Sequence, residues 1–147
     1  MARLVSFALP LVALAAACGG GNGGAEDDGP PPKVPACAGS APAIARPGEL
    51  RDDFPLPRGT VLRSKEQPFP GQTILRGVAP AGLDEAASFF ETELPDAGYQ
   101  LGRRDAEAGE RESLFTGNGI RGGWRVRSIP DCDAVQVTLV LIRQPTG

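Results

Sequence analysis

A single amphipathic helix, set between stretches typical of strands, places the tightest constraint on the fold of this chain. Apolar side chains recur every three or four residues, as one face of a helix requires; they are Leu83, Ala86, Ala87, Phe90 and Leu94. Pro95 and Gly98 then predict the end of the helix. Because one apolar stripe must be buried against another element, we expect a sheet beneath this helix.

Alternating apolar residues predict six strands around the helix. Two precede it, at 60–64 and 72–79, and four follow it, near 99–101 and at 111–116, 123–129 and 135–142. Asn118-Gly119 is a strong signal for a hairpin between two of them. The order β-β-α-β-β-β-β predicts an α+β fold, with a mostly antiparallel sheet packed by one helix, in a single domain over residues 49–144.

The last predicted strand is apolar on both of its faces. Val135, Val137 and Leu139 alternate on one face, and Val140 and Ile142 lie on the other. This pattern predicts either a central position in the sheet or a second covered face.

Residues 18–48 have the composition of a linker rather than of a folded segment. Glycine dominates 19–24, and proline and alanine dominate 30–47. Neither stretch offers enough apolar surface to fold by itself. We therefore expect a disordered linker before the domain.

The first eighteen residues resemble the leader of a bacterial lipoprotein precursor. Arg3 carries a positive charge, residues 4–14 are an apolar run, and three alanines lead directly to Cys18. The run is too short for a permanent transmembrane helix, which needs ~20 apolar residues. The resemblance implies that residues 1–17 are removed as a signal peptide and that Cys18 carries lipid. The alternative is an ordinary secretory signal that is cut near Ala17.

The resemblance also implies a location. Two or three acyl chains on Cys18 would hold the protein lastingly on a membrane, on the extracytoplasmic side. Loss of Arg3 with the leader removes one of 15 basic side chains against 18 acidic ones, which leaves a net charge of −4. A mildly acidic protein has no general attraction to nucleic acid, so we expect none as a partner. The segment 78–101 is loosely similar to small bacterial envelope lipoproteins, and this likeness says nothing about activity.

The other two cysteines form an even pair once Cys18 is assigned to lipid. In an exported, oxidising setting we expect a disulfide between Cys37 and Cys132. The alternative is a reactive thiol at Cys132. Its neighbours Asp131 and Asp133 argue against a thiolate, because adjacent carboxylates disfavour the negative charge.

The composition removes the commonest catalytic groups. The chain has no histidine, which excludes Ser-His-Asp and Cys-His nucleophile systems and leaves zinc sites of the Cys/His kind without ligands. We therefore expect neither an enzyme, nor a metal site, nor a cofactor. A hydrolase with paired carboxylates stays open as an improbable alternative; its acids would come from Asp52, Asp53, Glu91, Glu93, Glu107, Glu110 and Glu112.

A glycine motif at residues 117–122 matches G-x-G-x-x-G. Dinucleotide binding needs a helix after this motif and an acidic residue about 20 positions further on. The residues that follow, 123–129, have a strand pattern instead. The sequence therefore predicts a hairpin turn here.

Arginines on adjacent strands are the one local feature that suggests a ligand. Arg125 and Arg127 must share a strand face opposite Trp124, and Arg121 lies on the same strand. Together they could bind phosphate or carboxylate groups. The alternative is ordinary cross-strand pairing with Glu110 and Glu112.

These observations favour a membrane-tethered envelope protein without enzymatic activity, which binds or positions a partner. That partner is either another envelope protein or an anionic envelope component, such as a lipid headgroup or an acidic glycan, held on the arginine face of Arg121, Arg125 and Arg127.

Overall fold

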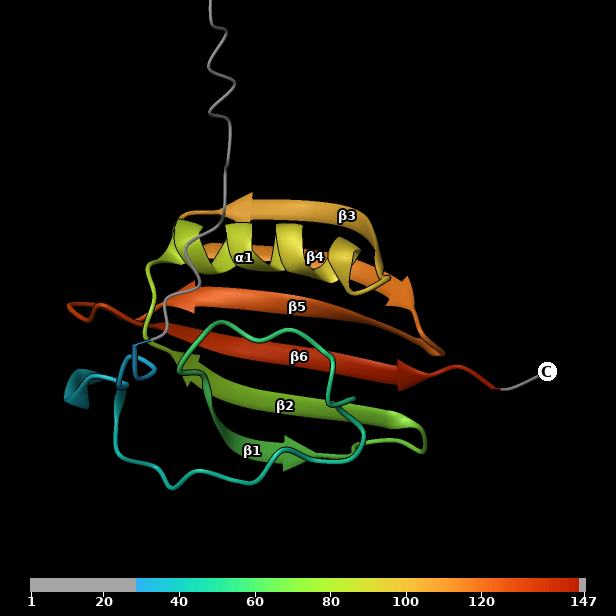
Figure 1. Cartoon of the computed structure of the whole chain (residues 1–147), viewed down its shortest axis with the longest axis horizontal. Coiled ribbons are helices and arrows are strands. Elements are labelled where there is room, and N and C mark those ends of the chain that lie inside the picture. The colour runs from blue at the N-terminus through green and yellow to red at the C-terminus, as the bar shows by residue number, and fades with distance from the viewer. Residues whose placement is uncertain (1–28, 146–147) are drawn as a thin grey trace, which may run out of the picture.

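A computed structural model describes residues 29–145 and contains one helix and a six-stranded antiparallel sheet. The strands are β1 (Val61–Glu66), β2 (Gln72–Ala79), β3 (Gln100–Glu107), β4 (Glu110–Gly117), β5 (Ile120–Ser128) and β6 (Val135–Arg143). Their order across the sheet is β1-β2-β6-β5-β4-β3, as Figure 1 shows. The predicted α+β class and the order β-β-α-β-β-β-β are confirmed.

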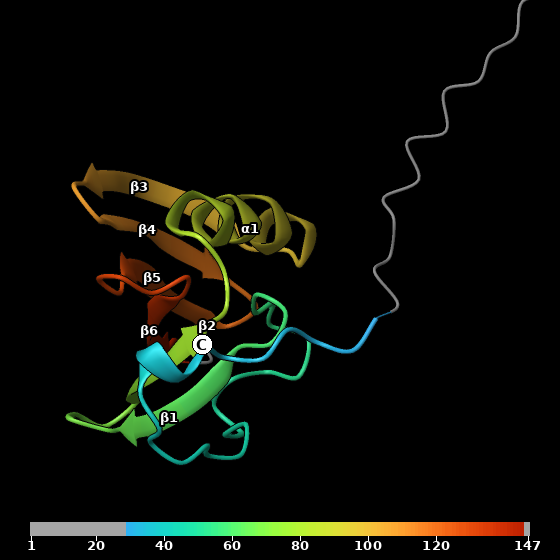
Figure 2. The ribbon, with the colours of Figure 1, turned by 90° about the vertical axis from the view of Figure 1, so that its left-hand side faces the viewer.

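The helix α1 (Leu83–Asp96) packs on the half of the sheet formed by β3, β4 and β5. Its predicted apolar stripe is the buried face, with Ala86, Ala87, Phe90 and Leu94 all buried. Phe90 stacks on Trp124 of β5 at a centroid distance of 5.2 Å. This stacking fixes the helix over that half of the sheet, and Figure 2 shows the helix on one side only.

The other half of the same sheet face is covered by irregular chain rather than by a second helix. The loop before β1 buries Leu50 and Phe54, and Phe54 packs edge-on to Tyr99 and against Phe115. In Figure 1 this loop crosses in front of β6, β2 and β1. Helix and loop together therefore close one face of the sheet, which we call the inner face.

β6 lies between β2 and β5, which confirms the central position predicted for the last strand. Its second apolar face is not covered by any helix of residues 29–145. The hairpin between β4 and β5 turns at Asn118 and Gly119, which have φ values of 50° and 76°. Positive φ at both positions is the geometry that Asn-Gly predicts.

The ordered part of the chain begins earlier than the predicted boundary at residue 49. Cys37 and Cys132 form a disulfide with Cα atoms 5.7 Å apart, as expected from the sequence. The guanidinium of Arg63 donates hydrogen bonds to the carbonyl oxygens of Ala38 and Gly39, and the amide of Ile44 donates to Leu62. Because these contacts tie residues 37–44 to β1 and to the β5–β6 turn, the disordered linker expected up to residue 48 must be shorter.

The predicted leader and Cys18 lie outside the described residues. Within residues 29–145, no helix is both long enough and apolar enough to cross a membrane.

Removal of the disulfide should destabilise the fold. Replacing both Cys37 and Cys132 with serine frees a loop with a sequence separation of 95 residues, which should lower the free energy of unfolding by up to about 4 kcal/mol in the chain-entropy account. Urea unfolding followed by tryptophan fluorescence measures this loss, because Trp124 is buried under α1. An unchanged urea midpoint would show that the first residues of the ordered part add nothing to stability.

Candidate binding face

The sheet face opposite α1 is the candidate functional surface, and we call it the outer face. Side chains alternate between the two faces along each strand. Trp124 points to the inner face, where it meets Phe90, so Gly123 and Arg125 belong to the outer face. The same alternation places Val140 on the outer face, beside the fully buried Leu139.

An apolar row runs across the middle of the outer face. Ile74 of β2 pairs with Val140 of β6, Val140 with Gly123 of β5, and Gly123 with Leu114 of β4. Gly102 of β3 comes next, since a Cβ on it would lie 3.3 Å from the Cβ of Leu114. We call these five residues the apolar row. Leu114 is 57% exposed, which is high for a large apolar side chain.

The outer face is hollowed along this row. An open hollow of about 980 Å³ lies over the five strands from β2 through β6, β5 and β4 to β3, and the apolar row lines it. Two of the five positions are glycine, so the floor of the hollow is backbone at those points. A shallow apolar floor of this kind is where a ligand could bury surface.

The two glycines at the centre of β5 have different roles. A Cβ on Gly122 would overlap the carbonyl oxygen of Val140 and lie 2.8 Å from Cζ of Phe115, so the inner face leaves no space for it. A Cβ on Gly123 would lie 3.4 Å from the Ser113 oxygen, which is ordinary contact. Packing therefore requires glycine at 122 but not at 123.

Two of the three predicted arginines pair with acids. Arg125 donates to Glu112 at 2.8 Å and lies 3.2 Å from Glu110, and Arg127 donates to Glu110 at 2.6 Å. The hydrogen bond to Glu112 and the charge of Glu110 raise the pKa of Arg125 above its ordinary value. Cross-strand pairing, the alternative weighed for the sequence, thus describes Arg125 and Arg127.

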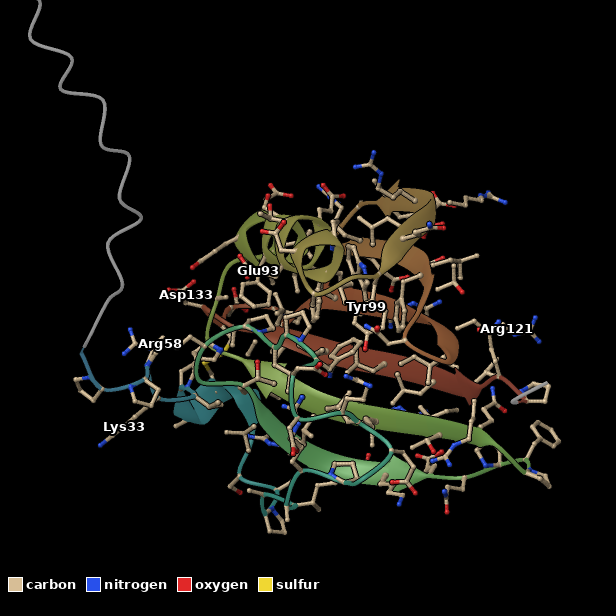
Figure 3. The ribbon with its side chains drawn as sticks, turned by 45° about the vertical axis from the view of Figure 1, so that its right-hand side comes forward. Lys33, Arg58, Glu93, Tyr99, Arg121 and Asp133 are labelled. Carbon is tan, nitrogen blue, oxygen red and sulfur yellow. A yellow bond between two sulfur atoms is a disulfide. The ribbon has the colours of Figure 1, made fainter. Side chains whose placement is uncertain are left out.

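Arg121 is different. It lies on the same strand face, two residues before Gly123, and no hydrogen bond or ion pair involves its side chain within residues 29–145. Figure 3 shows its guanidinium extended into solvent at one end of the sheet. It also lines the hollow. Of the three predicted residues, Arg121 is therefore the one free to meet an anion.

Four of the carboxylates named for a hydrolase pair with arginines. Glu110 and Glu112 are held by arginines, and Glu91 lies 3.4 Å from Arg104. Arg51 binds Asp53 through two hydrogen bonds and lowers the pKa of that carboxyl. A general acid needs the opposite shift. Residues 29–145 hold no group of three His, Cys, Asp or Glu side chains placed to bind a metal.

The glycine motif at 117–122 spans the β4–β5 hairpin, as the strand pattern of the residues after it predicted. Gly117 ends β4 and Gly122 lies within β5, so no helix begins there to receive a pyrophosphate.

The sequence predicted the second apolar face of β6, which holds Val140, but not a row that continues across five strands. Leu114 stands between Ser113 and Phe115, which are both buried on the inner face, so an apolar residue at 114 breaks the alternation expected of a strand with one solvated face. That break was the available signal. Gly123 gave none, because a glycine in a strand does not by itself indicate a hollow.

Comparison with protein-family models, with curated proteins and with solved structures finds no match to this chain.

Substitutions at the two adjacent glycines should show that the inner face is tightly packed at Gly122 and that the outer face is open at Gly123. Gly122→Ala should lower the free energy of unfolding by about 2 kcal/mol or more, because the methyl group overpacks the inner face. Gly123→Ala should change it by less than about 0.5 kcal/mol. Paired thermal melts measure both. Equal losses would show that the outer face is packed as tightly as the inner one.

Proposed function

We propose that this protein is a membrane-tethered binding module of a bacterial envelope, without enzymatic activity. In this proposal Cys18 carries the lipid anchor, residues 19–36 form the spacer, and the outer face of the sheet contacts a ligand or partner. The resemblance of residues 1–18 to a lipoprotein leader supports the anchor. The observation that carries the binding role is the apolar row, with Leu114 57% exposed at the edge of an open hollow.

An apolar row on the outer face has a cost that folding does not require. The inner face supplies the core, with Leu75, Val137 and Leu139 almost fully buried. Ile74, Val140 and Leu114, on the opposite side, add little to that core and keep apolar surface in contact with water. Contiguous exposed apolar surface marks interaction sites in proteins that fold alone.

The spacer sets how far the binding face can lie from the membrane. The disulfide fixes Cys37 to the β5–β6 turn. Within this spacer Pro32 already lies against Gly59 of the domain, so the 13 residues of 19–31 set its reach, which is at most about 47 Å when they are fully extended. The domain can therefore reach ligands at the membrane surface as well as partners above it.

The anchor predicts a change in fractionation. Cys18→Ser should move the protein from the membrane fraction to the soluble extracytoplasmic fraction, because acyl chains are what hold it. Immunoblots of the two fractions measure this shift, and Ala17→Ser is a matched control that keeps the cysteine. A Cys18→Ser protein that stays with the membrane would contradict the proposed anchor.

Occupation of the outer face predicts a footprint in intact envelopes. Thr116→Cys places a thiol on the outer face, and Glu93→Cys places one on the exposed side of α1. A membrane-impermeant maleimide should label position 116 several-fold more slowly in the envelope than in purified protein, and position 93 equally in both. The disulfide cysteines and a lipidated Cys18 do not compete for the reagent.

Equal labelling of position 116 in the two preparations would show that the outer face is unoccupied in the envelope. That result would overturn the binding role while leaving the anchor untouched.

A further inference from the structure

We propose that the outer face binds a single-chain anionic amphiphile, in which an alkyl chain lies along the apolar row and a terminal carboxylate or phosphate meets Arg121. This inference rests on the proposed function, because it names the ligand class of the same face.

The apolar row is wide enough for one alkyl chain but too narrow for an amphipathic helix. Residues two apart on a strand are about 6.8 Å apart, so the neighbouring rows begin about that far from Gly123 on either side. Those rows carry Arg125 and Thr138 on one side, and Arg121 and Thr116, with the apolar Ile142 between Arg121 and β2, on the other. An amphipathic helix is about 10–12 Å across and needs a broad apolar contact, so it would bury these polar groups. An alkyl chain would not.

The length and depth of the row suit the same ligand. The row crosses five strands, from β2 to β3, and strands are about 4.8 Å apart, so it is about 19 Å long. Arg121 lies on β5, the middle strand of the row, so an alkyl chain whose anionic end meets Arg121 follows about half of this length, toward β2 or toward β3. Gly123 and Gly102 remove side chains along its course, and the hollow of about 980 Å³ follows it.

An extended peptide fits this surface less well. Peptides that add to sheets gain main-chain hydrogen bonds at a free edge. On the outer face the backbone groups around Gly123 are already engaged with β4 and β6. A ligand on this face can be bound only by apolar contact and by attraction between opposite charges.

The charge of the hollow favours an anion. Four arginines and two acids line the hollow, although the net charge of the whole chain is −3. The arginines are Arg76, Arg103, Arg121 and Arg125, and the acids are Asp105 and Glu112. Arg76 pairs with Glu66, Arg125 with Glu112, and Arg103 with Asp105 at 3.4 Å. Arg121 is the arginine left to offer its planar donors to a phosphate or carboxylate.

The test titrates dodecyl phosphate, below its micelle concentration, into the full chain carrying Cys18→Ser, so that no attached lipid competes. Calorimetry should show one bound molecule per chain. Gly123→Val should weaken binding at least about tenfold by filling the hollow, and Leu114→Glu should do the same by placing a carboxylate beside the anion. Arg121→Gln should weaken it about tenfold.

Arg104→Gln is the matched control, because Arg104 pairs with Glu91 of α1 on the other side of the sheet. It removes the same charge and should leave the affinity unchanged. Thermal melts of each variant establish that it is folded; Leu114→Glu changes an exposed side chain and so tests the face even if Gly123→Val does not fold.

Four results would overturn the proposal. Equal affinity for dodecyl maltoside would show that the anion is not recognised. Equal affinity for inorganic phosphate would show that the apolar row is not used. Association with phosphatidylglycerol vesicles without binding of monomeric dodecyl phosphate would assign the face to the membrane surface. A footprint at position 116 together with no binding of dodecyl phosphate would reject this ligand class and leave the proposed function standing.

Discussion

The stacking of Phe90 on Trp124 determines which side of the sheet is inside. Their ring centroids are 5.2 Å apart and both side chains are almost fully buried. Because side chains alternate along a strand, Trp124 on the inner face forces Gly123 and Arg125 to the outer face. A register slip of one residue would exchange the two faces along the whole strand. The outer surface is therefore a consequence of how the helix docks.

The inner face is closed by two unlike pieces of chain. The helix covers β3 to β5, and the loop with Leu50 and Phe54 covers the remainder. The loop depends on non-local ties: Ile44 bonds to Leu62, and the disulfide holds the segment before it. Within residues 29–145 no helix lies over the apolar row, so this face of the described sheet is open.

The sequence predicted those parts of the fold that depend on local pattern. The helix stripe, the Asn118-Gly119 turn and the two-sided apolar strand β6 each follow from spacing within one segment. Residues 37–48 were assigned to a disordered linker because their composition is poor in apolar residues. Their order comes instead from hydrogen bonds to Arg63 and Leu62, which no local pattern encodes.

The candidate site was predicted only in part, for a similar reason. Strand parity placed Arg125 and Arg127 on one face, but their partners on β4 depend on the cross-strand register. The hollow combines residues of five strands that are far apart in sequence. Its local signs were the apolar residue at 114, which breaks the alternation of β4, and the second apolar face of β6 at Val140 and Ile142.

Methyl NMR would test most directly whether the outer face is the binding surface. Envelope lipid extract, dispersed with the full chain carrying Cys18→Ser, should shift the methyl signals of Ile74, Leu114 and Val140. The signals of Leu75, Val137 and Leu139, which lie on the inner face, should stay in place. Shifts confined to the inner-face methyls, or no shifts at all, would contradict the account.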